Sequence, residues 1–221
     1  MIPVSELCEI IRSGKNDRLE SLFMETPGLA DAKTDQGISI LTFACYCRNT
    51  GAVGIIRQHK KNLDCFEAAS AGDFRTLESY LSTHPSSINS YSVDGFTLLG
   101  LSCFFGHREI AEFLVHQGAD VNLASNNTFH VAPLHSACAI SDFAIAELLL
   151  NNGADPNATQ QAGVTPLHEA AHHGRTDLAQ LLLNYKANVN ARTEIGQTPL
   201  AMAKEGGFAE TALFLQKNGA S

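Results

Sequence analysis

The feature that most constrains the fold is a phrase that returns at a nearly fixed interval. Residues 163–171 read GVTPLHEAA, and residues 196–203 read GQTPLAMA. Diverged copies occur earlier, as APLHSAC at residues 132–138 and GFTLL at residues 95–99. The four copies share a leucine, which stands at Leu99, Leu134, Leu167 and Leu200. Such self-similarity indicates stacked units that bury one continuous core.

A second repeated phrase occurs at the same interval as the first. It reads QGADVN at residues 117–122, NGADPN at residues 152–157 and KANVN at residues 186–190. A period of about 33 residues that carries both Thr-Pro-Leu-His and Gly-Ala-Asp-x-Asn resembles the ankyrin repeat. The match is specific over residues 94–221. The resemblance implies an all-α solenoid of helix–turn–helix units joined by short hairpin loops.

The N-terminal half repeats itself over a longer interval, which spans two units. Sliding the sequence so that Gly14 falls on Gly72 also places Gly37 on Gly95 and Leu41 on Leu99. About seven units, with diverged units at the N-terminus and caps at the ends, then carry the motif position at Leu7, Leu41, Cys65, Leu99, Leu134, Leu167 and Leu200. We expect a single domain over residues 1–221, with units near 1–35, 36–62, 63–93, 94–127, 128–160, 161–193 and 194–221.

Two intervals depart from the regular spacing. The interval from Leu41 to Cys65 is much the shortest, and it leaves too little chain for the usual hairpin. The sequence therefore predicts a shortened second unit, with a tight turn at residues 60–64 and a local break in the stacking. The interval from Leu99 to Leu134 is instead slightly long. It predicts a longer hairpin around Asn126 and Asn127, because insertions in repeat proteins fall in loops.

The sixth unit shows why each unit should form two helices. Thr165 can cap a helix that begins at Pro166, since the N–H that proline lacks would have no intrahelical partner at that position. Gly174 suits the positive φ that often ends a helix. Residues 177–183 carry leucines at three- and four-residue steps, so one face of a second helix is expected to be buried.

Charge and composition narrow the classes of partner. The net charge of −8 argues against nucleic acid, because affinity for phosphates comes largely from lysine and arginine. The longest apolar stretch, residues 38–47, is far shorter than the roughly 20 residues that cross a bilayer. No signal-peptide pattern opens the sequence. We therefore expect a soluble, cytoplasmic monomer with reduced cysteines and with no nucleic-acid or membrane partner.

The strongest hint of catalysis is the segment HEAAH at residues 168–172. On a helix this pattern can place two zinc-binding histidines beside a general base, so a metal-dependent hydrolase is the alternative function. No third ligand stands out nearby. The resemblance gives His168 another role, which His135 shares, since the histidine of the ankyrin motif ties the hairpin to the first helix by hydrogen bonds. We expect no metal, no cofactor and no enzymatic activity.

The cysteines are predicted to be structural, with one exception. Cys45, Cys103 and Cys138 share a repeat position at which Ala171 stands in the next unit, and this indicates a small buried side chain. Cys47 is expected to face the groove and to be a reactive thiol.

The resemblance also implies where a partner would bind. In ankyrin stacks the hairpins and first helices form a concave face, and partners touch the hairpin tips and the ends of the first helices. Those positions are unexpectedly apolar here, which is typical of an interaction surface. The candidate partner-binding residues are Tyr46, Phe96, Phe104, Phe105, Phe129, Val131, Ile140, His172 and His173. The alternative, that the phenylalanines pack internally, stays open.

These features together favour a scaffold that mediates protein–protein interaction over an enzyme. A preformed groove loses little entropy on binding, so a rigid stack of helices suits recognition. The identity of the partner protein does not follow from the sequence.

Overall fold

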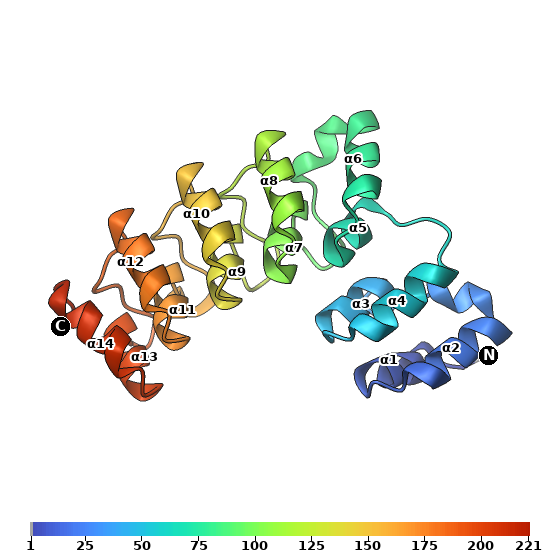
Figure 1. Cartoon of the computed structure of the whole chain (residues 1–221), viewed down its shortest axis with the longest axis horizontal. Coiled ribbons are helices and arrows are strands. Elements are labelled where there is room, and N and C mark those ends of the chain that lie inside the picture. The colour runs from blue at the N-terminus through green and yellow to red at the C-terminus, as the bar shows by residue number, and fades with distance from the viewer. Residues whose placement is uncertain (1) are drawn as a thin grey trace.

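The protein is an elongated stack of seven antiparallel helix pairs (Figure 1). The structure is a computed structural model, and it describes residues 2–221. The first helices of the pairs are α1 (Val4–Arg12), α3 (Ile40–Tyr46), α5 (Cys65–Ala71), α7 (Leu98–Phe105), α9 (Pro133–Ala139), α11 (Pro166–His172) and α13 (Pro199–Glu205). The second helices are α2 (Asn16–Glu25), α4 (Thr50–His59), α6 (Phe74–Thr83), α8 (Arg108–His116), α10 (Phe143–Asn151), α12 (Thr176–Asn184) and α14 (Ala209–Lys217).

The connections between the pairs contain no regular strand within residues 2–221. Short 3-10 turns form η1 (Pro27–Asp31), η2 (Pro85–Asn89) and η3 (Gln161–Gly163). The predicted all-α repeat fold is therefore confirmed. One helix pair lies in each of the seven ranges that the sequence marks as units, and the single-domain organisation stays a prediction.

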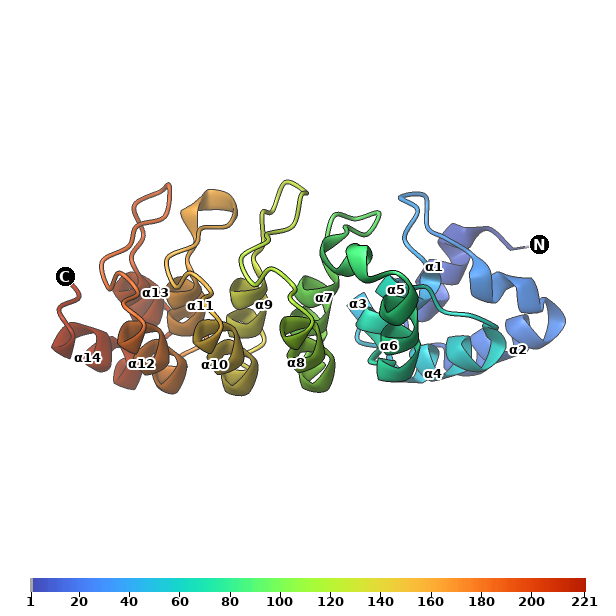
Figure 2. The ribbon, with the colours of Figure 1, turned by 90° about the horizontal axis from the view of Figure 1, so that it is seen from above.

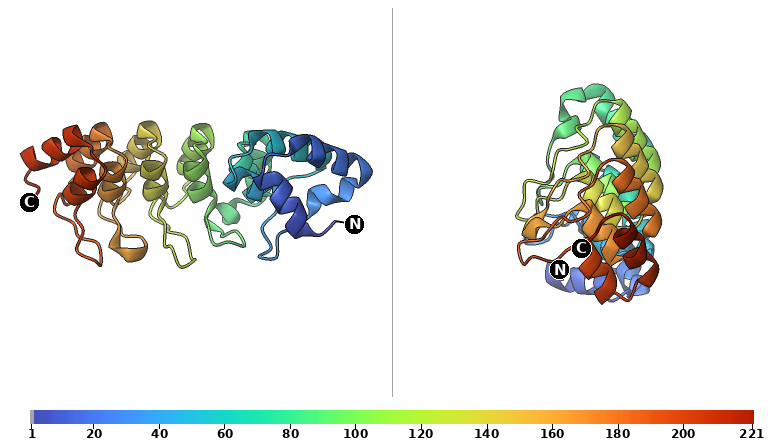
Figure 3. Two further views of the ribbon diagram at one scale, coloured as in Figure 1. Left: turned by 90° about the horizontal axis from the view of Figure 1, so that it is seen from below. Right: turned by 90° about the vertical axis from the view of Figure 1, so that its left-hand side faces the viewer.

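Hairpin loops project from one side of the stack. In Figure 2 the loops lie along one edge, α7, α9, α11 and α13 lie next to them, and the second helices form the outer row. The end-on view in Figure 3 shows the loops leaving the helices in a common direction. The first helices and the hairpins therefore share one face of the molecule, which we call the groove face.

The helices begin and end where the local chemistry predicts. The first helix of the sixth unit begins at Pro166, and Thr165 caps it. Gly106 and Gly174, which follow first helices, have φ of 75° and 64°. Glycine enters this left-handed region without the clash that a Cβ atom would cause.

The longer repeat of the N-terminal half is a duplication of structure. The shift that places Gly14 on Gly72 also places both ends of α2 on the ends of α6. The hairpins that follow these helices carry isolated bridges at equivalent positions, Lys33 with Ser39 and Tyr91 with Thr97. Units one and two therefore share a plan with units three and four.

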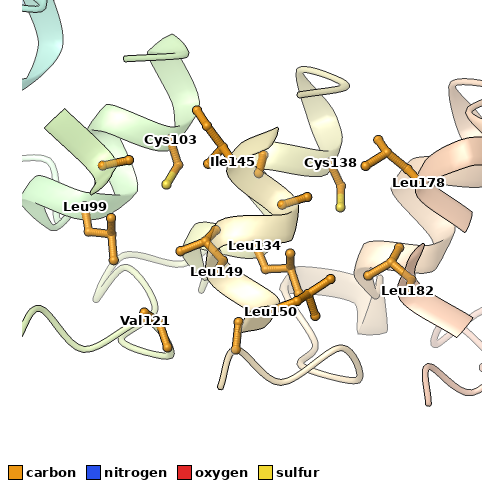
Figure 4. Packing of buried hydrophobic residues seen from close by; sticks show 14 of the residues in the cluster. Leu99, Cys103, Val121, Leu134, Cys138, Ile145, Leu149, Leu150, Leu178 and Leu182 are labelled. Atoms are coloured by element: carbon orange, nitrogen blue, oxygen red, sulfur yellow. The ribbon is translucent and has the colours of Figure 1, made fainter. Parts of the chain in front are cut away.

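Small and aliphatic side chains fill the space between neighbouring units. The larger core runs continuously from α5 to α14 and includes Leu99, Leu134 and Leu167 of the repeated motif. Cys103 and Cys138 are fully buried in this core and form no disulfide (Figure 4), which confirms the prediction of small apolar core residues. Each unit gains most of its stability from its neighbours, because buried apolar surface contributes about 25 cal/mol per Å².

The core is divided where the second unit meets the third. A separate cluster built from α1 to α4 contains Leu7, Leu41 and Ile56. Residues 60–64 join α4 to α5 as an extended segment with one bend at Lys61 and without a hairpin. The predicted shortening of the second unit is confirmed and the divided core agrees with the predicted break in the stacking, but the predicted tight turn is wrong. In Figure 1 helices α1–α4 are turned away from the row that α7–α14 form. We call this junction the seam.

The other irregular interval lengthens a loop, as predicted. Residues 117–132 connect α8 to α9, and this connection is longer by two than residues 152–165 and 185–198, which connect the next helix pairs. The longer hairpin is hydrogen-bonded to the preceding hairpin. Asn126 N donates to Gly95 O at 2.9 Å, and Asn127 Nδ2 donates to Asp94 O at 2.8 Å.

Asparagine side chains tie successive units together beyond the second helices. Asn122 Nδ2 donates to Gly153 O at 2.9 Å, and Asn157 Nδ2 donates to Lys186 O at 3.1 Å. Asn190 continues the ladder into the last unit. The asparagine of the Gly-Ala-Asp-x-Asn phrase is thus a connector that satisfies a backbone carbonyl one unit away.

A buried ion pair holds the seam. Lys60 Nζ lies 3.0 Å from Glu67 Oε1 and 2.9 Å from Asp31 Oδ1. The second Glu67 oxygen accepts a hydrogen bond from Asp64 N at 3.0 Å. The side chains of Lys60 and Glu67 are only 8% and 4% exposed, so both charges depend on these partners in place of water.

Replacing Lys60→Met should destabilise the fold by about 3 kcal/mol, because it leaves the Glu67 carboxylate buried without a cation. Urea unfolding of the purified variant measures this change. The matched control is Lys61→Met, since Lys61 is exposed and forms no ion pair within residues 2–221. Equal stabilities of the two variants would show that the seam does not depend on the ion pair.

Candidate functional site

The histidine of the repeated motif is a structural residue. His168 is buried at the start of α11, where its Nδ1 accepts from the Thr165 hydroxyl at 2.8 Å and from Thr165 N at 3.2 Å. Its Nε2 lies 3.1 Å from Gln197 O in the next hairpin. A neutral ring protonated at Nε2 satisfies these bonds, and burial lowers the pKa of His168. The hydrogen-bonding role that the resemblance implied is confirmed.

His135 repeats this arrangement with one bond missing. Its Nε2 lies 3.1 Å from Val164 O, but Ala132 stands where the next unit has Thr165. The buried Nδ1 atom of His135 therefore has no hydrogen-bond partner within residues 2–221. Burial lowers the pKa of this histidine from 6.5 to about 4, so the ring is neutral in the folded protein near pH 7.

The HEAAH segment does not converge on a metal site. Both ring nitrogens of His168 are engaged in hydrogen bonds, whereas His172 is exposed at the end of α11. Glu169 accepts from Gln160 Nε2 at 2.8 Å, and burial raises the pKa of its carboxyl group. Among residues 2–221 no group of three or more His, Cys, Asp or Glu is placed to hold a metal ion. This geometry favours a structural histidine over the hydrolase alternative.

The surroundings of Cys47 do not favour the expectation of a reactive thiol in the groove. Its side chain packs against the N-terminal core cluster. Burial raises the pKa of its thiol, and nearby Arg12 offsets only part of that effect. A raised pKa leaves less of the thiolate, which is the reactive form. Cys45 borders the pocket described below, and burial raises its pKa to about 12.

Three aromatic rings meet across the seam on the groove face. The ring centroid of Tyr46, at the end of α3, lies 6.0 Å from that of Phe104 and 5.3 Å from that of Phe105. The two phenylalanine rings are edge-to-face at 5.1 Å. The Tyr46 hydroxyl donates to Asp94 Oδ2 at 2.7 Å, which fixes its ring against the fourth unit. Aromatic pairs in such geometry add about 0.5–1.5 kcal/mol each beyond the burial of their area.

A pocket of about 370 Å³ lies beside these rings. The small residues Ser70 and Ala71, at the end of α5 in the third unit, line the pocket between units two and four. Phe104 and Phe105 line one wall, and Ile140 reaches the pocket from the end of α9. The opposite wall is built from α3, α4 and the turn between them. The pocket exists because the third unit is small where its neighbours are large.

The structure brings four of the predicted residues together at this place. Phe104, Phe105 and Ile140 line the pocket, and Tyr46 contacts the two phenylalanines. All four side chains are half-buried. They are therefore partly packed inside the protein and partly accessible to a partner. Phe105 packs against the main core and still forms a wall of an open pocket.

The other five predicted residues do not line this pocket. Phe96 is half-buried and packs against the main core, as Phe105 does, and its role in binding stays a prediction. Phe129 is 55% exposed in the long hairpin, and half-buried Val131 follows it. His172 and His173 are exposed at the end of α11, with their rings 5.1 Å apart. The predicted strip is therefore several separate places along the groove face.

Two features of the site were missed by the sequence reasoning. Val93, at the tip of a hairpin, is 68% exposed. Arg48 lines the pocket with φ of +53°, at the position that follows the end of the first helix. Five of the seven units have a glycine at that position, so the departure from the repeat was visible in the sequence. Its location in a pocket was not, since the pocket is formed by several units at once.

Comparison with known proteins agrees with the repeat. The family model described as "Ankyrin repeats (3 copies)" matches residues 65–160 and 134–221, which together make up well over half of the chain. The E3 ubiquitin-protein ligase Ufd4 of Drosophila melanogaster is 31% identical over 109 residues, which is 49% of this chain and 4% of the ligase. The chain therefore spans a small part of the length of that relative. Within residues 2–221 no helix is both long and apolar enough to cross a bilayer.

Replacing Ala132→Thr should stabilise the fold by about 1 kcal/mol, because the new hydroxyl gives the buried Nδ1 of His135 the partner that it lacks. Thermal unfolding measures the gain. The control is Ala132→Val, which has the shape of threonine without the hydroxyl. A valine variant as stable as the threonine variant would mean that packing, and not the hydrogen bond, is responsible.

Proposed function

The chain belongs to the ankyrin-repeat family, and on that premise we propose that it is a non-catalytic module that holds a partner protein on its groove face. The observation that carries the proposal is the half-exposed aromatic cluster of Tyr46, Phe104 and Phe105 beside an open pocket. Interfaces commonly centre on such aromatic side chains next to a preformed cavity.

The binding surface of the proposal extends beyond the pocket. The exposed side chains of Phe129, His172 and His173 lie on the same face, in later units of the stack, and Val131 lies between Phe129 and the helices. A partner segment laid along the groove face would pass them in turn. Phe96 supports this surface from behind, through its contact with the main core.

The seam supports binding by a rigid surface. The Lys60–Glu67 pair and the Tyr46–Asp94 hydrogen bond fix the second unit against the third and fourth. A pocket that is formed before the partner arrives loses little conformational entropy on binding. The pocket therefore suits recognition by a scaffold.

The similarity to the Ufd4 ligase does not extend the ligase reaction to this chain, because the aligned segment is only 4% of that protein. The same proposal includes a monomer in the cytoplasm, with no nucleic-acid or membrane partner. The six unpaired cysteines favour a reducing compartment.

The experiment that tests the proposal is site-specific photo-crosslinking. A photo-reactive amino acid replaces Phe104, and a control probe replaces Gln180, which is exposed on the second helix α12. Each protein is irradiated in lysate of its source and the adducts are identified by mass spectrometry. We expect one dominant protein adduct at position 104 and none of that protein at position 180.

Equal, sparse labelling at both positions would contradict a recognition site at the pocket. Capture of the same protein at position 180 alone would show that the partner binds the second helices and not the pocket. Circular dichroism and thermal unfolding of both labelled proteins ensure that either result comes from the folded chain.

A further inference from the structure

Arg48 is the one acidic or basic side chain that lines the pocket, apart from His107. Nε2 of His107 lies 2.9 Å from Ser70 O, so this ring is used to hold α7 against α5. Arg48 is exposed and has no salt bridge within residues 2–221, whereas Arg12 and Arg57 each contact a carboxylate. A cation without a partner therefore stands at the edge of a largely apolar pocket.

The backbone at Arg48 is in a conformation that is unfavourable for a residue other than glycine, and five other units have glycine at this position. Its φ of +53° lies in the left-handed region, where Gly14, Gly72, Gly106, Gly174 and Gly207 occupy the equivalent position. A residue with a Cβ atom is disfavoured there by about 1 kcal/mol relative to glycine. Ser141 is the other exception, with φ of +60°, and it has no charge.

The charge of the chain is unevenly distributed around the seam. Residues 1–60 contain seven acidic and seven basic side chains, whereas residues 61–221 contain sixteen acidic and eight basic ones. The C-terminal units therefore carry a net negative charge, and Arg48 is the Lys or Arg side chain that lines the pocket itself. The pocket thus combines an apolar cavity with one local positive charge.

The size of the cavity limits what can enter it. At about 370 Å³ it is near the lower end of the roughly 300–1,000 Å³ that small-ligand sites have, which is room for a large side chain and not for a helix. The walls of Phe104, Phe105 and Ile140 offer this side chain only apolar contacts. A carboxylate next to it on the same peptide would face the guanidinium of Arg48.

The geometry points to a specific occupant: a partner protein segment that inserts one large apolar side chain between Ala71 and Phe105 and places a neighbouring Asp or Glu against Arg48. This inference rests on the proposed function and adds to it the chemistry of the recognised sequence. The acidic side chain supplies specificity, because the same segment with Lys in its place would meet an unpaired like charge.

Four variants test this inference, and they distinguish the effect of the Arg48 charge on binding from effects on the stability of the fold. Arg48→Gly removes the cation and relieves the left-handed strain, so its melting temperature should rise. Ser141→Gly relieves the same strain at the equivalent position without any change of charge, and it is the matched control. Arg48→Glu reverses the charge, and Ala71→Trp fills the cavity while leaving Arg48 in place.

The probe is a library of synthetic peptides in pools, each pool fixing one apolar residue and one neighbouring residue in an otherwise random sequence. We expect the wild type and Ser141→Gly to select pools that pair Phe, Leu or Trp with Asp or Glu. Arg48→Gly should bind those pools about fivefold more weakly, as the loss of one partly exposed ion pair implies. Arg48→Glu should prefer Lys or Arg instead of the acid, and Ala71→Trp should lose the apolar preference.

Three results would overturn the inference in different ways, and Phe105→Glu, which places a charge in the wall of the pocket, separates the first two. Selected peptides that bind less well to Phe105→Glu but show no acidic preference, and no reversal with Arg48→Glu, would leave the groove as a recognition site and remove the role of Arg48. Selection that neither Phe105→Glu nor Ala71→Trp affects would place binding elsewhere and remove the proposed function as well. A dimer in sedimentation that Ala71→Trp dissociates would make a second copy of the chain the occupant, which also contradicts a foreign acidic segment.

Discussion

The structure depends on burial of the apolar face of each helix pair against the next pair. No single pair can remove its leucines from water, so order spreads from unit to unit through residues such as Leu134 and Leu167. Polar side chains at the two edges keep the units in register. His168 links the hairpins on one side, and Asn157 links the turns on the other. Where this stacking is interrupted, at the seam, the molecule acquires its most distinctive surface.

The seam follows from a shortage of chain. The short interval between the equivalent positions Leu41 and Cys65 leaves no room for a hairpin, so α4 passes directly to α5 and the core divides. Polar contacts replace part of the lost apolar contact, chiefly the buried Lys60–Glu67 pair. The small end of α5, at Ala71, then borders a cavity that Phe104 and Phe105 of the fourth unit line, and Tyr46 of the second unit packs against these two rings. A local deletion in a repeat can thus create a site without any new element.

Much of this fold could be predicted from the sequence, because its information is local and repeated. The period, the helix boundaries at Pro166 and Gly174, the missing hairpin at residues 60–64 and the role of His168 all follow from patterns within one or two units. The pocket could not be predicted in the same way, since its walls come from units two, four and five. Side-chain packing around the helix ends could not be predicted either, so the contacts of Phe96 and Cys47 with the two cores are known only from the structure.

The central claim is that the pocket at the seam is a recognition site, and the most direct measurement is fluorine NMR. A 4-fluorophenylalanine at position 105 reports on the pocket, and one at Phe208, which is partly exposed in the last unit, reports on a distant surface. When the crosslinked partner protein is added, we predict that the resonance at position 105 shifts and that the resonance at position 208 does not. A shift at position 208 with none at position 105 would contradict the claim.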